Sequence, residues 1–320
     1  MILQTNNFVS DLERWAKAYK NQIRALSYSL NTIELYSRAI DQFIEYSLQH
    51  QDETTMKDIK SIYITGFLSY LEDEARLKGK KIKNGLYLSK STKITYLKAI
   101  RGFFTFISDN NDDLHTYDRY FKNIKVADSS RSEEKIIYLT EKEIGRLLNV
   151  LEREKSQKGT YGSYRNALLV KLLLYAGLRI SEALQLKIDN FKEGKDAKIY
   201  KIEIYGKGGK DQTAFIIKKH IEEELEYFKN ILENSDLIMK TKNGNIWNRS
   251  NAFEVVNNLY LKAQIYNKKG LHLLRHTLAM RLTQRDVDLI TIMKILRHSN
   301  IATTTIYAKA TEESINEAII

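Results

Sequence analysis

The sequence predicts a mainly α protein of two domains, the second of which contains one small antiparallel β-sheet. Through most of the first third of the 320 residues, apolar side chains recur three and four positions apart, as on one face of a helix. A polar and acidic stretch, 109–134, then breaks this pattern. Further on, residues 198–205 alternate between apolar and polar side chains, which is typical of a half-buried strand.

The first domain, 1–110, is expected to be a helical bundle with a shared core. Asn31 and Ser89 are candidate caps for the starts of its second and last helices. The helical periodicity covers residues 8–20, 32–48, 59–77 and 92–107.

Residues 111–137 are interpreted as a linker, and the second domain is expected to run from 138 to 320. Thr140 and Glu143 have the spacing of a capping box and predict a helix through residue 154. The strongly apolar segment 164–176 predicts a buried helix that stops at Gly177. Residues 198–205 and 213–217, separated by the glycine-rich 206–209, predict a β-hairpin, and the remainder is expected to be helical.

The distribution of charge points to a nucleic acid as the partner. The net charge is +11; residues 76–101 carry 9 Lys and Arg and no acid, and residues 135–320 carry 31 against 22 acids. Basic patches attract the phosphate backbone, although such a surplus can also serve only to keep a protein in solution. The longest apolar run, 167–178, is too short to cross a bilayer. With no cysteine and no secretory pattern in residues 1–10, we expect a cytoplasmic protein without a membrane span.

Cleaving a phosphodiester without a metal requires a nucleophilic oxygen, cations over the phosphate oxygens and an acid for the leaving oxygen. The sequence contains neither a carboxylate or Cys/His cluster at metal-ligand spacing nor a glycine-rich phosphate loop, which disfavours metal nucleases and nucleotide hydrolases. His272 and Arg275 are three residues apart, so a helix would place them on one face. Alone, that pair is more typical of a solvated helix surface.

Four segments in order resemble the tyrosine recombinases, the phage integrase family, and most of all their Xer-like members. They are AGLRISEAL at 176–184, GKGGK at 206–210, HLLRH at 272–276 and HSNIATTTIY at 298–307. The resemblance covers the second domain, and the first domain is similar to the family's SAM-like core-binding domain. It implies a two-domain clamp around duplex DNA.

The resemblance implies that Arg179 and Arg275 hold the scissile phosphate, a task for which a bidentate, permanently charged guanidinium is well suited. The alternative for Arg179 is a structural ion pair with Glu182, to which we assign a supporting role. Lys207 would be the general acid and Lys210 its substitute, unless this segment is only a flexible basic turn.

By the same resemblance, Tyr307 is the nucleophile, His272 accepts or relays its proton, and His298 hydrogen-bonds the phosphate. His276 is expected to have a supporting, structural role. A phenol has a pKa of about 10, so the tyrosine needs nearby cations and a proton acceptor. Two positions depart from the family: Arg297 stands where Gly is usual, and Leu271 stands where Pro is frequent. Arg297 is expected either to change how the preceding helix ends or to add a contact to the phosphate.

The implied partners are double-stranded DNA with a specific recombination site, further copies of the chain and an accessory regulator, with no cofactor and no metal. Two protomers would bind a site and four a synapse. The tail, 311–320, is expected to be a helix exchanged between protomers or, alternatively, packed on its own domain. The helix at 248–262 is a candidate for groove contact. The residues expected to bind DNA are basic: Lys80, Lys81, Lys83, Lys90, Lys93, Arg101 and Lys210.

The expected function is site-specific recombination through a 3′-phosphotyrosine and a Holliday junction, in chromosome dimer resolution. Integration of a mobile element is the first alternative. A type IB topoisomerase or telomere resolvase would use the same chemistry without this strand exchange, and supercoil relaxation on DNA without a specific site would identify the topoisomerase. A DNA-binding protein without catalysis would not require the full set of polar motif residues.

Overall fold

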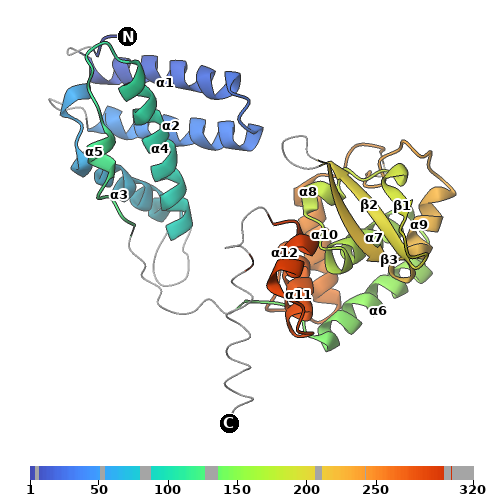
Figure 1. Cartoon of the computed structure of the whole chain (residues 1–320). Coiled ribbons are helices and arrows are strands. Elements are labelled where there is room, and N and C mark those ends of the chain that lie inside the picture. The colour runs from blue at the N-terminus through green and yellow to red at the C-terminus, as the bar shows by residue number, and fades with distance from the viewer. Residues whose placement is uncertain are drawn as a thin grey trace. The chain divides into compact units, whose positions relative to one another are not determined.

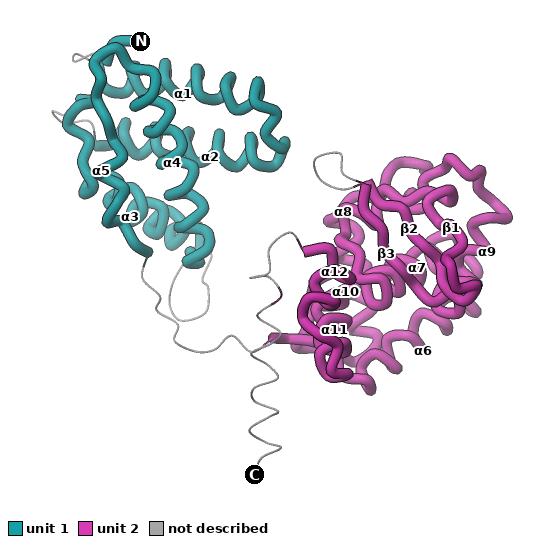
Figure 2. The backbone as a smooth tube through the Cα atoms, in the orientation of Figure 1, with its two compact units in different colours: residues 1–133 teal, residues 134–320 magenta. Residues whose placement is uncertain are grey.

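The computed structural model describes residues 1–3, 7–50, 55–79, 88–126, 136–205, 211–241, 243–298 and 304. They belong to two compact units, 1–133 and 134–320 (Figure 2). Within this described part, none of the helices combines the length and the apolar character needed to cross a membrane.

The first unit is a helical bundle in which each of the four predicted helices is present. The helices are α1 (Phe8–Ala25), α2 (Leu30–Gln49), α3 (Ser61–Leu77), α4 (Lys90–Asn110) and the short α5 (Asp118–Phe121). Ser89 caps α4 as predicted, because its side chain accepts a hydrogen bond from the Thr92 N–H. The prediction for Asn31 is wrong: Ser29 caps α2 by accepting from Thr32.

The predicted linker begins later than residue 111. Tyr117 and Phe121 are buried in the core of the first unit, and the Tyr117 hydroxyl donates to the Met56 carbonyl oxygen at 2.8 Å. Residues 111–126 therefore belong to the first unit, because buried aromatic rings attach this polar segment to the bundle.

The second unit is helical with a three-stranded antiparallel sheet (Figure 1). The strands β1 (Phe191–Glu193), β2 (Ile199–Tyr205) and β3 (Asp211–Ile217) lie in the order β1-β2-β3. The hairpin prediction is confirmed, whereas the edge strand β1 was not predicted. The helices are α6 (Glu141–Lys158), α7 (Tyr161–Tyr175), α8 (Ile180–Ala183), α9 (Glu222–Lys229), α10 (Arg249–Lys262), α11 (His272–Thr283) and α12 (Leu289–Leu296).

Helix α7 is the centre of the second unit. It packs against α6, α9, α10 and α11, and its residues 167–174 are all buried. This arrangement confirms the predicted buried helix and explains why its residues 167–174 are apolar except for Lys171, because a helix covered on several sides has no solvent face.

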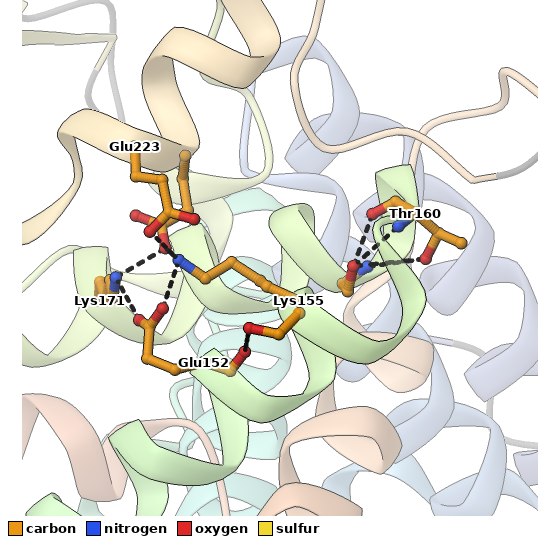
Figure 3. A network of polar contacts seen from close by, with 8 residues as sticks. Glu152, Lys155, Thr160, Lys171 and Glu223 are labelled. Atoms are coloured by element: carbon orange, nitrogen blue, oxygen red, sulfur yellow. Dashed lines mark hydrogen bonds and ion pairs between the residues drawn. The ribbon is translucent and has the colours of Figure 1, made fainter.

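A buried charge network connects α6, α7 and α9 (Figure 3). The Glu224 carboxylate, fully buried, accepts from Lys155 at 2.5 Å and from Lys171 at 2.6 Å. Glu152 contacts both ammonium groups, and Glu223 contacts that of Lys155. Lys171, which interrupts the apolar run of the sequence, is thus the partner that a buried glutamate requires.

Candidate active site

The turn between α7 and α8 positions Arg179. Gly177 ends α7 with a φ of 59°, and a Cβ atom there would lie 2.9 Å from both Leu278 and Leu296. Glycine therefore allows the left-handed turn and also its close packing on α11 and α12. Arg179 follows as the N-cap residue of α8.

Arg179 is held by two neighbours but is still accessible. Its Nη1 donates to Glu182 Oε1 at 2.7 Å, and its Nη2 donates to the Arg297 carbonyl oxygen at 2.7 Å. Its backbone N–H donates to Glu182 Oε2 at 2.8 Å. The side chain keeps 35% of its surface exposed, so the ion pair with Glu182 and an approach to a ligand are compatible.

Arg275 projects from α11 into the interior, with 5% of the residue exposed. Its Nη1 donates to the Gly177 carbonyl oxygen and its Nη2 to that of Leu296. Arg275 thereby links α11 to the end of α7 and to the end of α12. The guanidinium is placed by main-chain acceptors from two turns that are distant in sequence.

Three histidines lie in the electrostatic field of these arginines. Burial, with Arg249 and then Arg275 and Arg179, lowers the pKa of His272 below its usual 6.5. Burial, with His272 and Arg275, likewise lowers the pKa of His276. Desolvation and positive neighbours both disfavour the imidazolium, so the neutral form of His272 and His276 is favoured.

His298 follows the end of α12 and is anchored at its ring. Its Nδ1 lies 2.8 Å from Oγ1 of the fully buried Thr304. Burial, followed by the charges of Arg275 and Arg179, lowers its pKa to about 4. The charges of Arg179 and Arg275 thus reach both His272 and His298, so these four residues lie near one another, and the catalytic roles expected of them stay predictions.

Arg297 ends α12 in the left-handed conformation, with a φ of 55°. Its Nη2 lies 2.9 Å from Glu182 Oε2. From the sequence, Arg297 was expected either to affect how the helix ends or to add a phosphate contact, and no role was assigned to Thr304. The contacts of Arg297 with Gly177 and Glu182 could not be predicted locally, because these partners belong to distant segments, whereas Thr304 contacts His298 within the same segment.

Several predicted site residues lie outside the described part of the chain: Tyr307, Lys207, Lys210, Lys80, Lys81, Lys83 and the tail 311–320. The strand ends that flank 206–210 are described, and Tyr205 pairs with Asp211. Among the other predicted DNA-binding residues, Lys93 pairs with Glu72 at 2.9 Å, and Arg101 donates to the Phe121 carbonyl oxygen at 3.1 Å. Lys90 is the first residue of α4.

The described residues contain one acidic group at metal-ligand spacing, formed by Glu152, Glu223 and Glu224. The ammonium groups of Lys155 and Lys171 lie among these carboxylates. Because two cations of the protein already neutralise the group, we assign no metal to it.

Comparison with known proteins identifies the family. Residues 138–314 match the Phage integrase family. The chain belongs to this family, the tyrosine recombinases, whose members are DNA strand-exchange enzymes.

Two relatives are tyrosine recombinases named XerH. The chain is 29% identical to that of Campylobacter jejuni over 225 residues, which are 69% of this chain and 62% of the relative. It is 27% identical to that of Helicobacter pylori over 328 residues, 97% of this chain and 83% of the relative. The fold is also similar to a crystal structure of the XerH site-specific recombinase bound to a palindromic difH substrate, a post-cleavage complex. The two superpose with a TM-score of 0.75 and 27% sequence identity, over 97% of this chain and 84% of the XerH chain.

Proposed function

We propose that this chain is a site-specific tyrosine recombinase that cuts and rejoins double-stranded DNA through a covalent bond between Tyr307 and a 3′ phosphate. The convergence of Arg179, Arg275, His272 and His298, from three different segments, is the observation that carries this proposal. Support also comes from the family match, which includes residue 307.

In this proposal the two guanidinium groups bind the scissile phosphate. Arginine stays charged at every accessible pH and offers paired donors to phosphate oxygens. Charge that is already in place when the phosphorane forms stabilises the transition state more than the ground state. The main-chain and carboxylate contacts of Arg179 and Arg275 would supply this preorganisation.

The proton steps follow from the chemistry of the cluster. The Tyr307 oxygen attacks phosphorus while its proton passes to neutral His272, and the bond from phosphorus to the 5′ oxygen breaks. Lys207, or Lys210 in its place, would protonate the leaving 5′ oxygen, and His298 would donate to a phosphate oxygen. Attack by a 5′ hydroxyl on the phosphotyrosine reverses the step, so the cycle consumes no nucleotide.

The finer role we infer is chromosome dimer resolution on a specific site, as suggested by likeness to XerH bound to difH. Two copies would bind a site and four a synapse, with the tail helix exchanged between protomers and an accessory regulator controlling the exchange. The first unit would serve as the core-binding domain and the second as the catalytic domain of the clamp. Action on chromosomal DNA places the protein in the cytoplasm.

The test uses nicked suicide DNA substrates incubated without metal and scored for a protein–DNA adduct that survives denaturation. Wild type is expected to form the adduct, and Tyr307→Phe is expected to bind the DNA without forming it. Tyr266→Phe, which alters an exposed tyrosine of the same unit, is the control and should react like wild type.

The outcomes separate the alternatives. An adduct formed by Tyr307→Phe would reject Tyr307 as nucleophile. Specific binding without any adduct would favour a DNA-binding protein, and relaxation of supercoils on unrelated DNA would favour a topoisomerase.

A further inference from the structure

Arg297 has a buried side chain at a position where its backbone favours glycine. Its φ of 55° is disfavoured for any residue with a Cβ atom. Its side chain has 5% of its surface exposed, and burying a guanidinium is unfavourable unless it is paired. The contacts of the side chain therefore have to compensate for two unfavourable features at one residue.

We propose that Arg297 is a positioning residue that joins the two phosphate-binding arginines, Arg179 and Arg275, into one rigid network. The inference rests on the proposed function and concerns the same site.

The network toward Arg179 passes through Glu182. Glu182 Oε1 accepts from Arg179 Nη1 at 2.7 Å, and Oε2 accepts from Arg297 Nη2 at 2.9 Å. The Arg297 carbonyl oxygen, in turn, accepts from Arg179 Nη2 at 2.7 Å. Arg297 thus fixes Arg179 twice, once through its own main chain and once through the carboxylate that the two guanidinium groups share.

The network toward Arg275 passes through a main-chain carbonyl. The oxygen of Gly177 accepts from Arg297 Nη2 at 3.0 Å and also from Arg275 Nη1. Arg297 Nη1 donates back to the Ile295 oxygen at 3.0 Å, which keeps the side chain folded over the end of α12. A shift of Arg297 would therefore loosen the acceptor that places Arg275.

Accessibility sets Arg297 apart from Arg179. The Arg179 side chain is 35% exposed and that of Arg297 only 5%. The Arg297 Nη atoms are occupied by protein acceptors, and its Nε is buried without a hydrogen-bond partner among the residues that the structure describes. In the proposal, the phosphate therefore contacts Arg179 directly, and Arg297 acts on the phosphate only through Arg179 and Arg275.

Arg297 also controls the charge of Glu182. Burial favours the protonated carboxyl, but Arg297, followed by the hydrogen bonds and charge of Arg179, outweighs burial and lowers the Glu182 pKa. These are the charged groups that face Glu182: Arg179 at the start of its own helix and Arg297 from the end of α12. Arg275, from α11, reaches the shared Gly177 oxygen, and His298 follows Arg297 directly in the chain. Without Arg297, Glu182 should become protonated at a higher pH and release Arg179.

The test measures single-turnover adduct formation by the full chain on the suicide substrate from pH 5 to 9, with DNA binding measured separately. For Arg297→Gly, which relieves the backbone and removes the side chain, we expect adduct formation about ten-fold slower or more. DNA affinity should change far less, and the acidic limb of the rate profile should move to higher pH. Arg297→Lys keeps one positive charge and should restore part of the rate and of the pH profile.

Asp286→Gly is the matched control. Asp286 has a φ of 57°, is exposed and lies in the turn between α11 and α12, outside the network. The glycine relieves the same left-handed backbone conformation at residue 286 without changing the network, so this variant should cleave like wild type.

If Arg297→Gly fails to fold, the same measurements on Arg297→Gln decide, because glutamine removes the charge and keeps a polar side chain. A variant that cleaves at the wild-type rate with the wild-type profile would overturn the proposal, and so would a uniform loss without any shift in pH. Failure of wild type itself to form an adduct would reject the proposed function instead.

Discussion

The histidines near Arg275 are held neutral by their surroundings. Burial and neighbouring positive charges both lower the pKa values of His272 and His298. A general base must be unprotonated to accept the tyrosine proton, so burial, with Arg249 and then Arg275 and Arg179, favours the form of His272 that its proposed role requires.

Thr304 is expected to determine which nitrogen of His298 carries the proton. The 2.8 Å contact joins the hydroxyl to Nδ1. If the neutral ring receives this hydrogen bond at Nδ1, Nε2 carries the proton and is a donor for a phosphate oxygen. Thr304→Val, which removes the hydroxyl at similar volume, should slow adduct formation about ten-fold, the effect of one misplaced hydrogen bond.

Thr304→Ser is the control, because it retains the hydroxyl and should stay within a few-fold of wild type. The measurement is the single-turnover rate at pH 7.5 on DNA bound to saturation. Equal rates for the valine and serine variants would exclude the hydroxyl as the group that orients His298.

The candidate site could be predicted from the sequence where spacing within one element or a motif identifies the residues. His272 and Arg275 are three residues apart on one helix, and Arg179 follows the glycine that ends another. The role of Arg297 could not be predicted, because it depends on the Gly177 oxygen and on Glu182, more than a hundred positions away in the chain.

At the scale of elements, the buried ion network holds α6, α7 and α9 together. Lys171→Met leaves the buried Glu224 with Lys155 as its remaining buried partner. We expect the free energy of unfolding of the second unit to fall by about 3 kcal/mol, because a buried charge loses a partner. The double variant Lys171→Met, Glu224→Leu should lose less, since the buried carboxylate that lost a partner is gone and Lys155 keeps Glu152 and Glu223.

Lys158→Met is the control, because Lys158 is 51% exposed in its pair with Glu154 and should contribute less than about 1 kcal/mol. Each unit contains one tryptophan, Trp15 in the first and Trp247 in the second. Urea unfolding followed by fluorescence in a Trp15→Phe background therefore reports on the second unit. Equal losses for the two lysine variants would contradict a special role for the buried pair.

Elements with a strong local pattern were predicted, and those made by distant contacts were not. The amphipathic helices of the first unit, the capped α6 and the β2–β3 hairpin follow from periodicity and turn residues. β1 has only three residues and is a strand because it pairs with β2. The predicted linker is too long because Tyr117 and Phe121 lie in a polar stretch of sequence. Their burial becomes evident only from the core of the bundle, which they join.

At the scale of the whole molecule, the charge distribution predicts strongly salt-dependent DNA binding. Each lysine that neutralises a phosphate releases counterions, so the logarithm of affinity falls linearly with the logarithm of salt concentration. Lys81→Gln, in the basic stretch, should reduce the slope by about one and weaken binding to all sequences similarly.

Lys17→Gln serves as the matched control, since Lys17 is exposed in the first unit but belongs to a stretch, 1–75, with 7 basic and 11 acidic residues. Titrations from low to moderate salt on specific and unrelated duplexes give both slopes. If the salt dependence of affinity has the same slope for wild type and both variants, Lys81 of the basic stretch does not neutralise a phosphate.

The sequence by itself determined the fold class and which motif residues to expect in the candidate site, because helix periodicity, turn glycines and motif order are properties of neighbouring residues. Only the tertiary structure decided how Arg179 and Arg275 are held, which residues pair with Lys171 and where the first unit ends. These outcomes depend on contacts between segments far apart in the chain, where the burial of one group selects the partner that must satisfy it.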